Sequence, residues 1–143
     1  MFSNTTKYAI KASLYLAIHS SKEAKLVIKD IAEPINVPQA YIAKILQSLS
    51  KKGIISSTRG PKGGFYLSSN QFQTKIMDIV EAVDGEERIN SCLLSLEKCN
   101  SENPCSLHHL AYKEKQIINT NLRLTTLEEL RNHVLSGKSV LPL

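Results

Sequence analysis

Residues 58–67 read Thr-Arg-Gly-Pro-Lys-Gly-Gly-Phe-Tyr-Leu, with two cationic side chains among three glycines and a proline. Glycine reaches backbone angles that other residues avoid, and proline presets one turn angle. Ile54-Ile55 before the turn and residues 65–67 at its end can pair as two strands. The stretch therefore predicts a hairpin with a basic tip, which suits a groove lined by phosphates. Taken alone, these ten residues fit an ordinary surface hairpin equally well.

The segment before this hairpin has the order of a helix-turn-helix unit. Apolar periodicity predicts a helix over residues 8–19, capped by Ser3 or Asn4, and a short helix over 26–33 that Pro34 should end or kink. After a turn, Pro38 opens an amphipathic helix that Gly53 terminates. The buried stripe of that helix is predicted to be Ile42, Ile45, Leu46 and Leu49. Because this unit runs directly into the hairpin, the hairpin is interpreted as the wing of a winged-helix DNA-binding head.

The charge distribution favours a polyanion-binding surface in the N-terminal half. Residues 1–73 carry ten Lys/Arg against three Asp/Glu, whereas residues 74–143 carry eight against ten, within a total of +5. A basic half is typical of nucleic-acid binding, and the acidic remainder argues against a coat of membrane or nucleic acid over the whole chain. The second helix of such a unit enters the major groove by its N-terminal end. The predicted DNA-contacting residues are Gln39, Tyr41, Lys44, Arg59, Gly60 and Lys62.

The C-terminal half predicts helices around a polar loop. A helix capped by Thr74 should stop at Asp84-Gly85, and residues 86–104 form a long loop, which is usually functional or disordered. Asn103-Pro104 should then open a long helix from Cys105 to about residue 121. A final helix has a capping box of Thr125 or Thr126 with Glu128 or Glu129. Residues 136–143 are expected to form a loose tail.

The domain division follows from these elements. We expect a winged helix-turn-helix head over residues 1–73, and a linker helix, cysteine loop and dimerisation helices over residues 74–143. A long helix with an apolar stripe beside a DNA-binding head is a natural dimer interface, and packing within one protomer is the alternative. The expected fold is mainly α with a small β-hairpin.

Three cysteines, Cys92, Cys99 and Cys105, fall within fourteen residues. In a cytosolic protein such clustering indicates metal or redox chemistry before it indicates disulfides. The spacing is unlike a zinc ribbon, whereas thiolates held by a loop suit an iron–sulphur cluster. His108 or His109 could supply a fourth ligand because both lie close behind Cys105. Other candidates for the fourth ligand are an Asn, a group from a partner chain, or one of the carboxylates Glu86, Glu87 and Glu102. Two alternatives to metal binding also remain open: the cysteines are reactive thiols without metal, or they are inert.

An enzyme is the weaker class for this sequence. It shows no Ser/His/Asp order and no paired carboxylates in an apolar setting, and the glycines of the hairpin lack the Gly-Lys-Ser/Thr ending of a phosphate loop. The N-terminus has no secretory pattern and no apolar stretch is long enough to span a bilayer. We therefore expect a cytoplasmic protein.

The chain resembles the Rrf2 family of bacterial winged-helix transcriptional regulators over nearly its whole length. The matching segments are residues 7–12, 14–17, 28–32, 37–38, 41–42, 45–46, 53–65 and 79–85, together with the three cysteines. The resemblance implies a homodimer that binds palindromic promoter DNA through its winged helices and dimerises through a long C-terminal helix. In cluster-bearing members, three cysteines at about this spacing hold a [2Fe-2S] or [4Fe-4S] cluster.

Carried onto this sequence, the implied cluster ligands are Cys92, Cys99, Cys105 and His108, which lies three residues after the last cysteine. Lys7 stands where some members have an aspartate that ligates the partner's cluster, and Ala43 stands where others have a glutamate beside the DNA-reading face. We thus expect a dimeric transcriptional repressor whose promoter binding responds to an iron–sulphur cluster. The alternatives are the same regulator sensing through cysteine thiols or a small ligand, and a metal-dependent enzyme.

Overall fold

The computed structural model describes residues 2–95 and 97–143. Within them the chain is mainly helical and has one two-stranded antiparallel hairpin, so the expected fold class is confirmed. The helices are α1 (Asn4–His19), α2 (Ile28–Ile35), α3 (Gln39–Lys51), α4 (Ile76–Asn90), α5 (His108–Leu124) and α6 (Leu127–Leu135). The strands are β1 (Ser56–Thr58) and β2 (Gly64–Tyr66), and a short 3₁₀ helix, η1, covers Ser69–Gln73.

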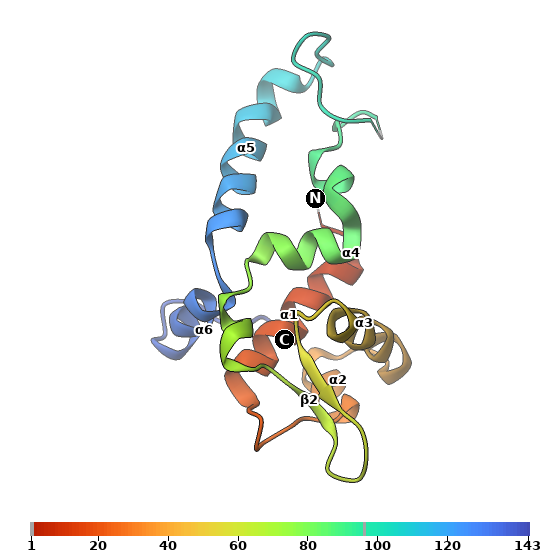
Figure 1. Cartoon of the computed structure of the whole chain (residues 1–143). Coiled ribbons are helices and arrows are strands. Elements are labelled where there is room, and N and C mark those ends of the chain that lie inside the picture. Colours follow the sequence, from red (N-terminus) through yellow and green to blue (C-terminus); the bar gives the residue numbers. More distant parts are fainter. Residues whose placement is uncertain (1, 96) are drawn as a thin grey trace.

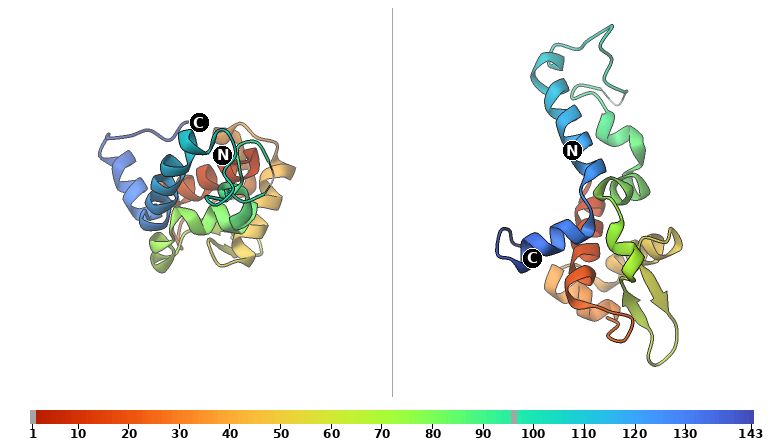
Figure 2. Two further views of the ribbon diagram at one scale, coloured as in Figure 1. Left: turned by 90° about the horizontal axis from the view of Figure 1, so that it is seen from above. Right: turned by 60° about the vertical axis from the view of Figure 1, so that its left-hand side comes forward.

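The molecule is elongated, with the hairpin at one end and the cysteine loop at the other (Figure 1). Helix α1 lies at the centre of the head, and α2, α3, α6 and the first part of α4 surround it. The last turn of α4 and helix α5 then extend away from the head to the loop that joins them, as the right-hand view of Figure 2 also shows. Any signal from that loop must therefore cross the head to reach the hairpin.

One hydrophobic core joins the helix-turn-helix unit to the C-terminal elements. The predicted stripe of α3 is buried throughout. It shares a cluster with Leu16 of α1, Ile79 of α4 and Leu127 of α6. Because α4 and α6 pack into the same core around α1, the predicted units 1–73 and 74–143 share this core, and the division between them stays a prediction.

The sequence predicts that Pro34 ends or kinks the short helix; α2 does not end there but continues to Ile35. Asn36 adopts a left-handed conformation (φ 57°), its amide donates to the Glu33 carbonyl at 3.0 Å, and the following amide donates to the Ala32 carbonyl at 3.1 Å. This pair of bonds is a Schellman motif, which terminates helices. Near the end of so short a helix, the missing amide of Pro34 removes a single hydrogen bond and does not stop the helix.

The hairpin strands are also shifted from the expected positions. Ile54 and Ile55 precede β1 and are buried in the core, so the ladder instead begins with Ser56 opposite Tyr66 and ends with Thr58 opposite Gly64. The two isoleucines are therefore core residues that fix the base of the hairpin. Phe65 in β2 exchanges two backbone hydrogen bonds with Leu26, which adds a third extended segment beside the wing.

Helix α4 breaks at Gly85 but does not stop there, contrary to expectation. Gly85 has φ 75° and ψ 165°, after which the chain resumes a helical course to Asn90. The start also differs: the cap is Lys75, whose amide donates to Asp78 at 3.0 Å, because the Thr74 carbonyl accepts from the Leu127 amide instead. The cysteine loop is consequently shorter than predicted, since its first residues belong to α4.

Helix α5 begins at His108, not at Cys105, so Cys105 lies outside the helix. A turn separates the two, in which the His108 amide donates to the Cys105 carbonyl at 3.0 Å. Asn103-Pro104 therefore belongs to the loop. The predicted capping box of α6 is confirmed as Thr126 with Glu129, whose side chains each accept from the other's amide. None of the helices in the described residues is both long and apolar enough to cross a bilayer.

Candidate DNA-binding surface and cysteine site

The N-terminal end of α3 presents exposed side chains beside the N-terminus of α1. Gln39, Tyr41 and Lys44 are all exposed there, as the helical period dictates for positions off the buried stripe. The Tyr41 hydroxyl is not free, because it lies 2.6 Å from the Thr5 hydroxyl of α1. Its ring packs edge-on against Tyr8, with 5.8 Å between centroids. Tyr41 is thus held to α1 by both its ring and its hydroxyl.

The tip of the wing exposes Arg59, Gly60 and Lys62 to solvent. The turn is tight: a Cβ on Gly63 would lie 2.3 Å from the Thr58 carbonyl oxygen, so a larger residue would force the turn open. Gly64 has a similar role on the other side, where a Cβ would lie 2.8 Å from the Leu26 carbonyl oxygen. These contacts explain why the stretch is rich in glycine, which alone permits such close approaches.

The three cysteines line one pocket of about 300 Å³ in the loop between α4 and α5. All three are half-buried free thiols. Hydrogen bonds shape the loop: the Cys92 amide donates to the Glu97 carbonyl at 2.7 Å, and the Cys99 amide donates to the Asn90 carbonyl at 3.1 Å. The structure therefore brings together cysteines that the sequence showed only as neighbours along the chain.

His108 joins this group and His109 does not. The Nδ1 atom of His108 lies 3.2 Å from the Cys99 sulphur, and its ring stacks on Tyr112 with 4.6 Å between centroids. His109, the neighbouring candidate, is exposed. Thiolates and imidazole are the ligands that iron–sulphur clusters use, so the donor set suits such a group. In the described residues, however, no three His, Cys, Asp or Glu side chains converge closely enough to hold a metal ion.

Cys92 has the most perturbed environment of the three thiols. The Leu94 amide donates to its sulphur at 3.4 Å. This bond, together with one from the Cys105 thiol, holds the pKa of Cys92 below its ordinary value because hydrogen bonds favour the thiolate. A thiolate is the form that binds metals and reacts with oxidants, so the pocket contains a sulphur suited to either chemistry.

The comparison with known families settles the class of protein. Residues 2–133 match the Rrf2 family, which is described as iron-dependent transcriptional regulators. This chain belongs to the Rrf2 family. It is therefore a DNA-binding transcriptional regulator, from a family of regulators and not of enzymes.

Individual relatives of this Rrf2 protein agree with that assignment. An HTH-type transcriptional regulator of Aquifex aeolicus is 34% identical over 134 residues, covering 92% of each chain. The regulator IscR of Pectobacterium atrosepticum is 31% identical over 127 residues, covering 89% of this chain and 76% of IscR. Among solved structures, CymR, the global cysteine regulator of B. subtilis, superposes with a TM-score of 0.74 at 22% identity, covering 93% and 97% of the two chains.

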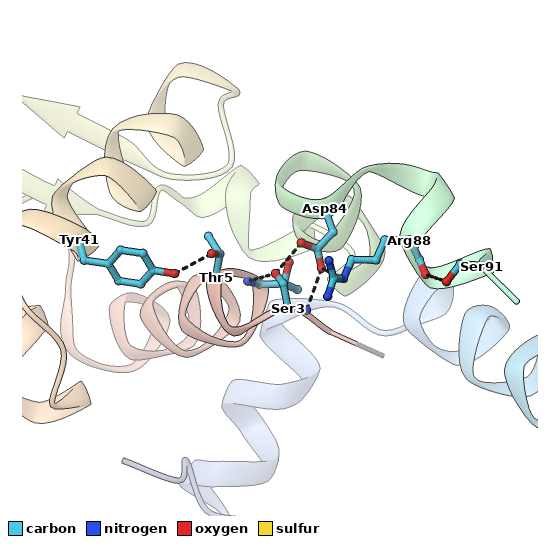
Figure 3. Close-up of polar contacts among 7 residues, drawn as sticks. Ser3, Thr5, Tyr41, Asp84, Arg88 and Ser91 are labelled. Atoms are coloured by element: carbon cyan, nitrogen blue, oxygen red, sulfur yellow. Dashed lines mark hydrogen bonds and ion pairs between the residues drawn. The ribbon is translucent and has the colours of Figure 1, made fainter. Parts of the chain in front are cut away.

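Sequence reasoning missed a set of polar contacts that joins the head of this Rrf2 protein to the cysteine loop (Figure 3). Asp84 accepts hydrogen bonds from the amide of Ser3 at 3.0 Å and from its hydroxyl at 2.5 Å. Arg88 lies 3.7 Å from the same carboxylate, and its carbonyl accepts from the Ser91 hydroxyl at 2.8 Å. The pattern Asp84-Gly85 indicated only a helix end, because nothing in the local sequence points to a partner 81 residues away.

Proposed function

We propose that this chain is a homodimeric repressor whose promoter binding is controlled by an iron–sulphur cluster held by Cys92, Cys99, Cys105 and His108. The observation that carries the proposal is the single pocket lined by all three thiols, with the His108 ring against Cys99. The four donors come from one loop and from the start of α5, so a movement of that loop would be the step that brings them onto a cluster.

A bound cluster would supply a redox- and oxygen-sensitive group that cross-links the loop. The protein's own contribution is structural. The loop begins at the end of α4 and ends at the start of α5, and both anchors are tied together: Asn119 of α5 donates to Asn90 of α4 at 2.8 Å, and Lys115 donates to the Ser91 carbonyl. A change in loop shape would therefore act on α4 and α5 together.

The proposed DNA surface combines the start of α3 with the wing, both within the predicted DNA-binding unit of residues 1–73. Gln39 and Lys44 are placed to enter a major groove, with Tyr41 between them, since the recognition helix docks by its N-terminal end. Arg59, Lys62 and the Gly60 backbone would meet phosphates or an adjacent minor groove, where arginine is favoured. All of these groups are exposed in the protomer.

The proposed dimer interface is one face of α5. Leu110, Ile117 and Leu124 follow one another at seven-residue intervals and are 60–64% exposed. Seven residues are close to two helical turns, so these side chains form a single stripe. A partner chain would remove this stripe from water and place two heads on a two-fold symmetric site.

Anaerobic purification tests the proposal. We expect a brown protein that contains iron and inorganic sulphide, and we expect Cys92→Ser, Cys99→Ser and Cys105→Ser each to abolish the visible absorbance. His108→Ala should lose or alter that spectrum, whereas His109→Ala, a matched change at the exposed neighbour, should keep it. Cluster-loaded and cluster-free protein should then differ in affinity for promoter DNA; equal affinities would exclude control by the cluster.

A second candidate keeps the DNA-binding head and makes the loop a thiol sensor. It is favoured by the free thiols around one pocket and by the contact between Cys92 and Cys105. CymR, which shares the fold, is the global cysteine regulator of B. subtilis. A colourless, iron-free protein whose DNA affinity changes on oxidation, and recovers on reduction, would support this second candidate over the first.

A further inference from the structure

The recognition helix α3 is attached at its N-terminal end to the first turn of α1. The attachment is the hydrogen bond between the hydroxyls of Tyr41 and Thr5. That turn of α1 is itself fixed, because its cap, Ser3, binds the amide of Thr6 at 3.0 Å and is held by the carboxylate of Asp84. Figure 3 shows Tyr41, Thr5, Ser3 and Asp84 following one another along this edge of the head.

The C-terminal end of α3 is attached to the turn of α4 that contains Asp84. Lys52, the residue that follows α3, donates its ammonium to the carbonyl of Ala82. In an unbroken helix that carbonyl would accept from the amide four residues later, but Gly85 interrupts the helix. The break leaves carbonyls free and concentrates negative partial charge, which a lysine satisfies. Ala82 thus holds the C-terminal end of α3 directly, and Asp84 supports its N-terminal end indirectly, through Ser3 and the first turn of α1.

The cysteine loop connects to this turn from the opposite side. Arg88 lies beyond the break at Gly85, and its guanidinium approaches the same Asp84 carboxylate that binds Ser3. Ser91, which directly precedes Cys92, donates to the Arg88 carbonyl. Asp84 therefore contacts both the cap of α1 and the segment leading to the cysteines.

We propose that Tyr41 and Asp84 are positioning residues for DNA binding: the Tyr41 hydroxyl orients α3 through Thr5 and does not read a base, and Asp84 fixes the α1 cap to which this bond belongs. The inference rests on the DNA-binding surface proposed above. It differs from that proposal by assigning the Tyr41 hydroxyl to a partner within the protein. The exposed Gln39 and Lys44 remain the groups available for base contacts.

A double-mutant cycle on the two hydroxyls tests the role of Tyr41. Thr5→Val and Tyr41→Phe each remove one partner of the bond while keeping the side-chain shape. With a duplex selected by the wild-type chain from a randomised oligonucleotide library, each variant should bind about fivefold more weakly, as expected for one hydrogen bond. The double variant should bind no more weakly than either single variant. A loss with Tyr41→Phe but none with Thr5→Val would show that the hydroxyl contacts DNA, and would overturn the inference.

A matched pair of acidic residues tests Asp84. Asp84→Asn removes the charge that holds Ser3, whereas Glu87→Gln removes an exposed charge one turn away on α4. We expect Asp84→Asn to weaken DNA binding about fivefold or more, since it loses a charge-assisted bond, and Glu87→Gln to bind as the wild type does. Equal affinities for all three proteins would overturn the role of Asp84.

Hydrogen exchange separates this inference from the DNA-binding proposal. Amides at the start of α3 and α1 should exchange faster in Thr5→Val and Asp84→Asn than in the wild type, without any DNA present. Unchanged exchange in both variants would contradict positioning even if the wild type selected no duplex. A wild type that selects no duplex would instead contradict the DNA-binding surface. Thr5→Val alters one hydroxyl of a half-buried residue, so it keeps the test valid if Asp84→Asn fails to fold.

Discussion

Arg123 of α5 lies 2.7 Å from the carboxylate of Glu81 in α4, and the same guanidinium is 3.7 Å from Glu86. The two carboxylates flank the break at Gly85, one on each side. A single cation on the proposed dimerisation helix therefore bridges the two segments of α4. The conformation at Gly85 therefore sets how the part of α4 in the head, the part of α4 that leads to the cysteine loop, and α5 lie relative to one another.

Replacement of Gly85 by alanine should destabilise the protein. Its φ of 75° with ψ of 165° suits glycine almost alone, and no atom lies within 4 Å of an added Cβ, so the cost comes from the backbone. We expect the free energy of unfolding in urea to fall by about 1–3 kcal/mol. Gly137→Ala is the control, with φ 77° and open space around an added Cβ just after α6. It should lower stability but keep normal DNA binding, whereas Gly85→Ala should lower both stability and DNA affinity.

Asp84 should make stability depend on acid pH. Burial acts to raise the pKa of its carboxyl, but the hydrogen bonds from Ser3, helped by Thr6 and Arg88, outweigh burial and lower it. A carboxyl with a lowered pKa stabilises the fold at pH values above its pKa in the unfolded chain, which is about 3.9. This contribution is lost as the pH falls through the pKa of the folded state. Asp84→Asn should cost about 1–3 kcal/mol at neutral pH and remove that part of the acid dependence.

Urea unfolding at neutral and acid pH measures this effect. The difference in stability between wild type and Asp84→Asn should shrink as the pH falls below the range where the carboxyl ionises. Glu87→Gln serves as the control and should follow the wild-type profile, because its side chain is exposed. A variant at Asp84 with the same acid dependence as the wild type would exclude the Ser3 bond as its source.

Arg59 at the tip of the wing should set the salt dependence of DNA binding. A dimer that neutralises six phosphates loses on the order of a thousandfold in affinity between about 50 and 200 mM salt. Arg59→Ala should weaken binding and reduce the slope of log affinity against log salt by about two, one contact from each head. Lys138→Ala removes a cation from the C-terminal tail and should leave the slope unchanged. Salt-independent binding would remove phosphate contacts as the basis of affinity.

Ile117 on α5 should decide the oligomeric state. Its side chain is 60% exposed in the protomer, so Ile117→Lys should leave the fold of the head intact while charging the centre of the apolar stripe. Burying an unpaired lysine is costly, and sedimentation should show a shift from dimer to monomer with weaker DNA binding. Gln116→Lys, at an exposed polar position about 100° around the helix from Ile117, should stay dimeric. A dimeric Ile117→Lys protein would place the interface elsewhere.

Features determined by short-range interactions could be read from the sequence. The buried stripe of α3 follows from helical periodicity, and the α6 cap at Thr126 and Glu129 follows from a four-residue motif. Serine three residues before Thr6 likewise marks the cap of α1. The clustering of cysteines was visible as well. The stripe and the two caps each depend on residues within one or two turns of each other, where local geometry decides the outcome.

Only the tertiary structure decided where long-range contacts replace local preferences. Ile54 and Ile55 look like strand residues, but both side chains are buried in the core, and the strand pairing begins after them at Ser56. Pro104 looks like the start of a helix, but residues 104–107 belong to the loop and α5 begins only at His108. In this arrangement His108, and not His109, lies next to Cys99.

The wing also combines features that are local in the sequence with contacts that depend on the tertiary structure. Its glycines and cations, in residues 58–64, predict a tight basic turn because the requirement for small residues is local. One contact between that DNA-binding head and the segment leading to the cysteines is the Asp84 carboxylate, bound to a serine 81 residues earlier. No sequence pattern encodes that pairing, since it exists only when α1 and α4 pack together around a shared core.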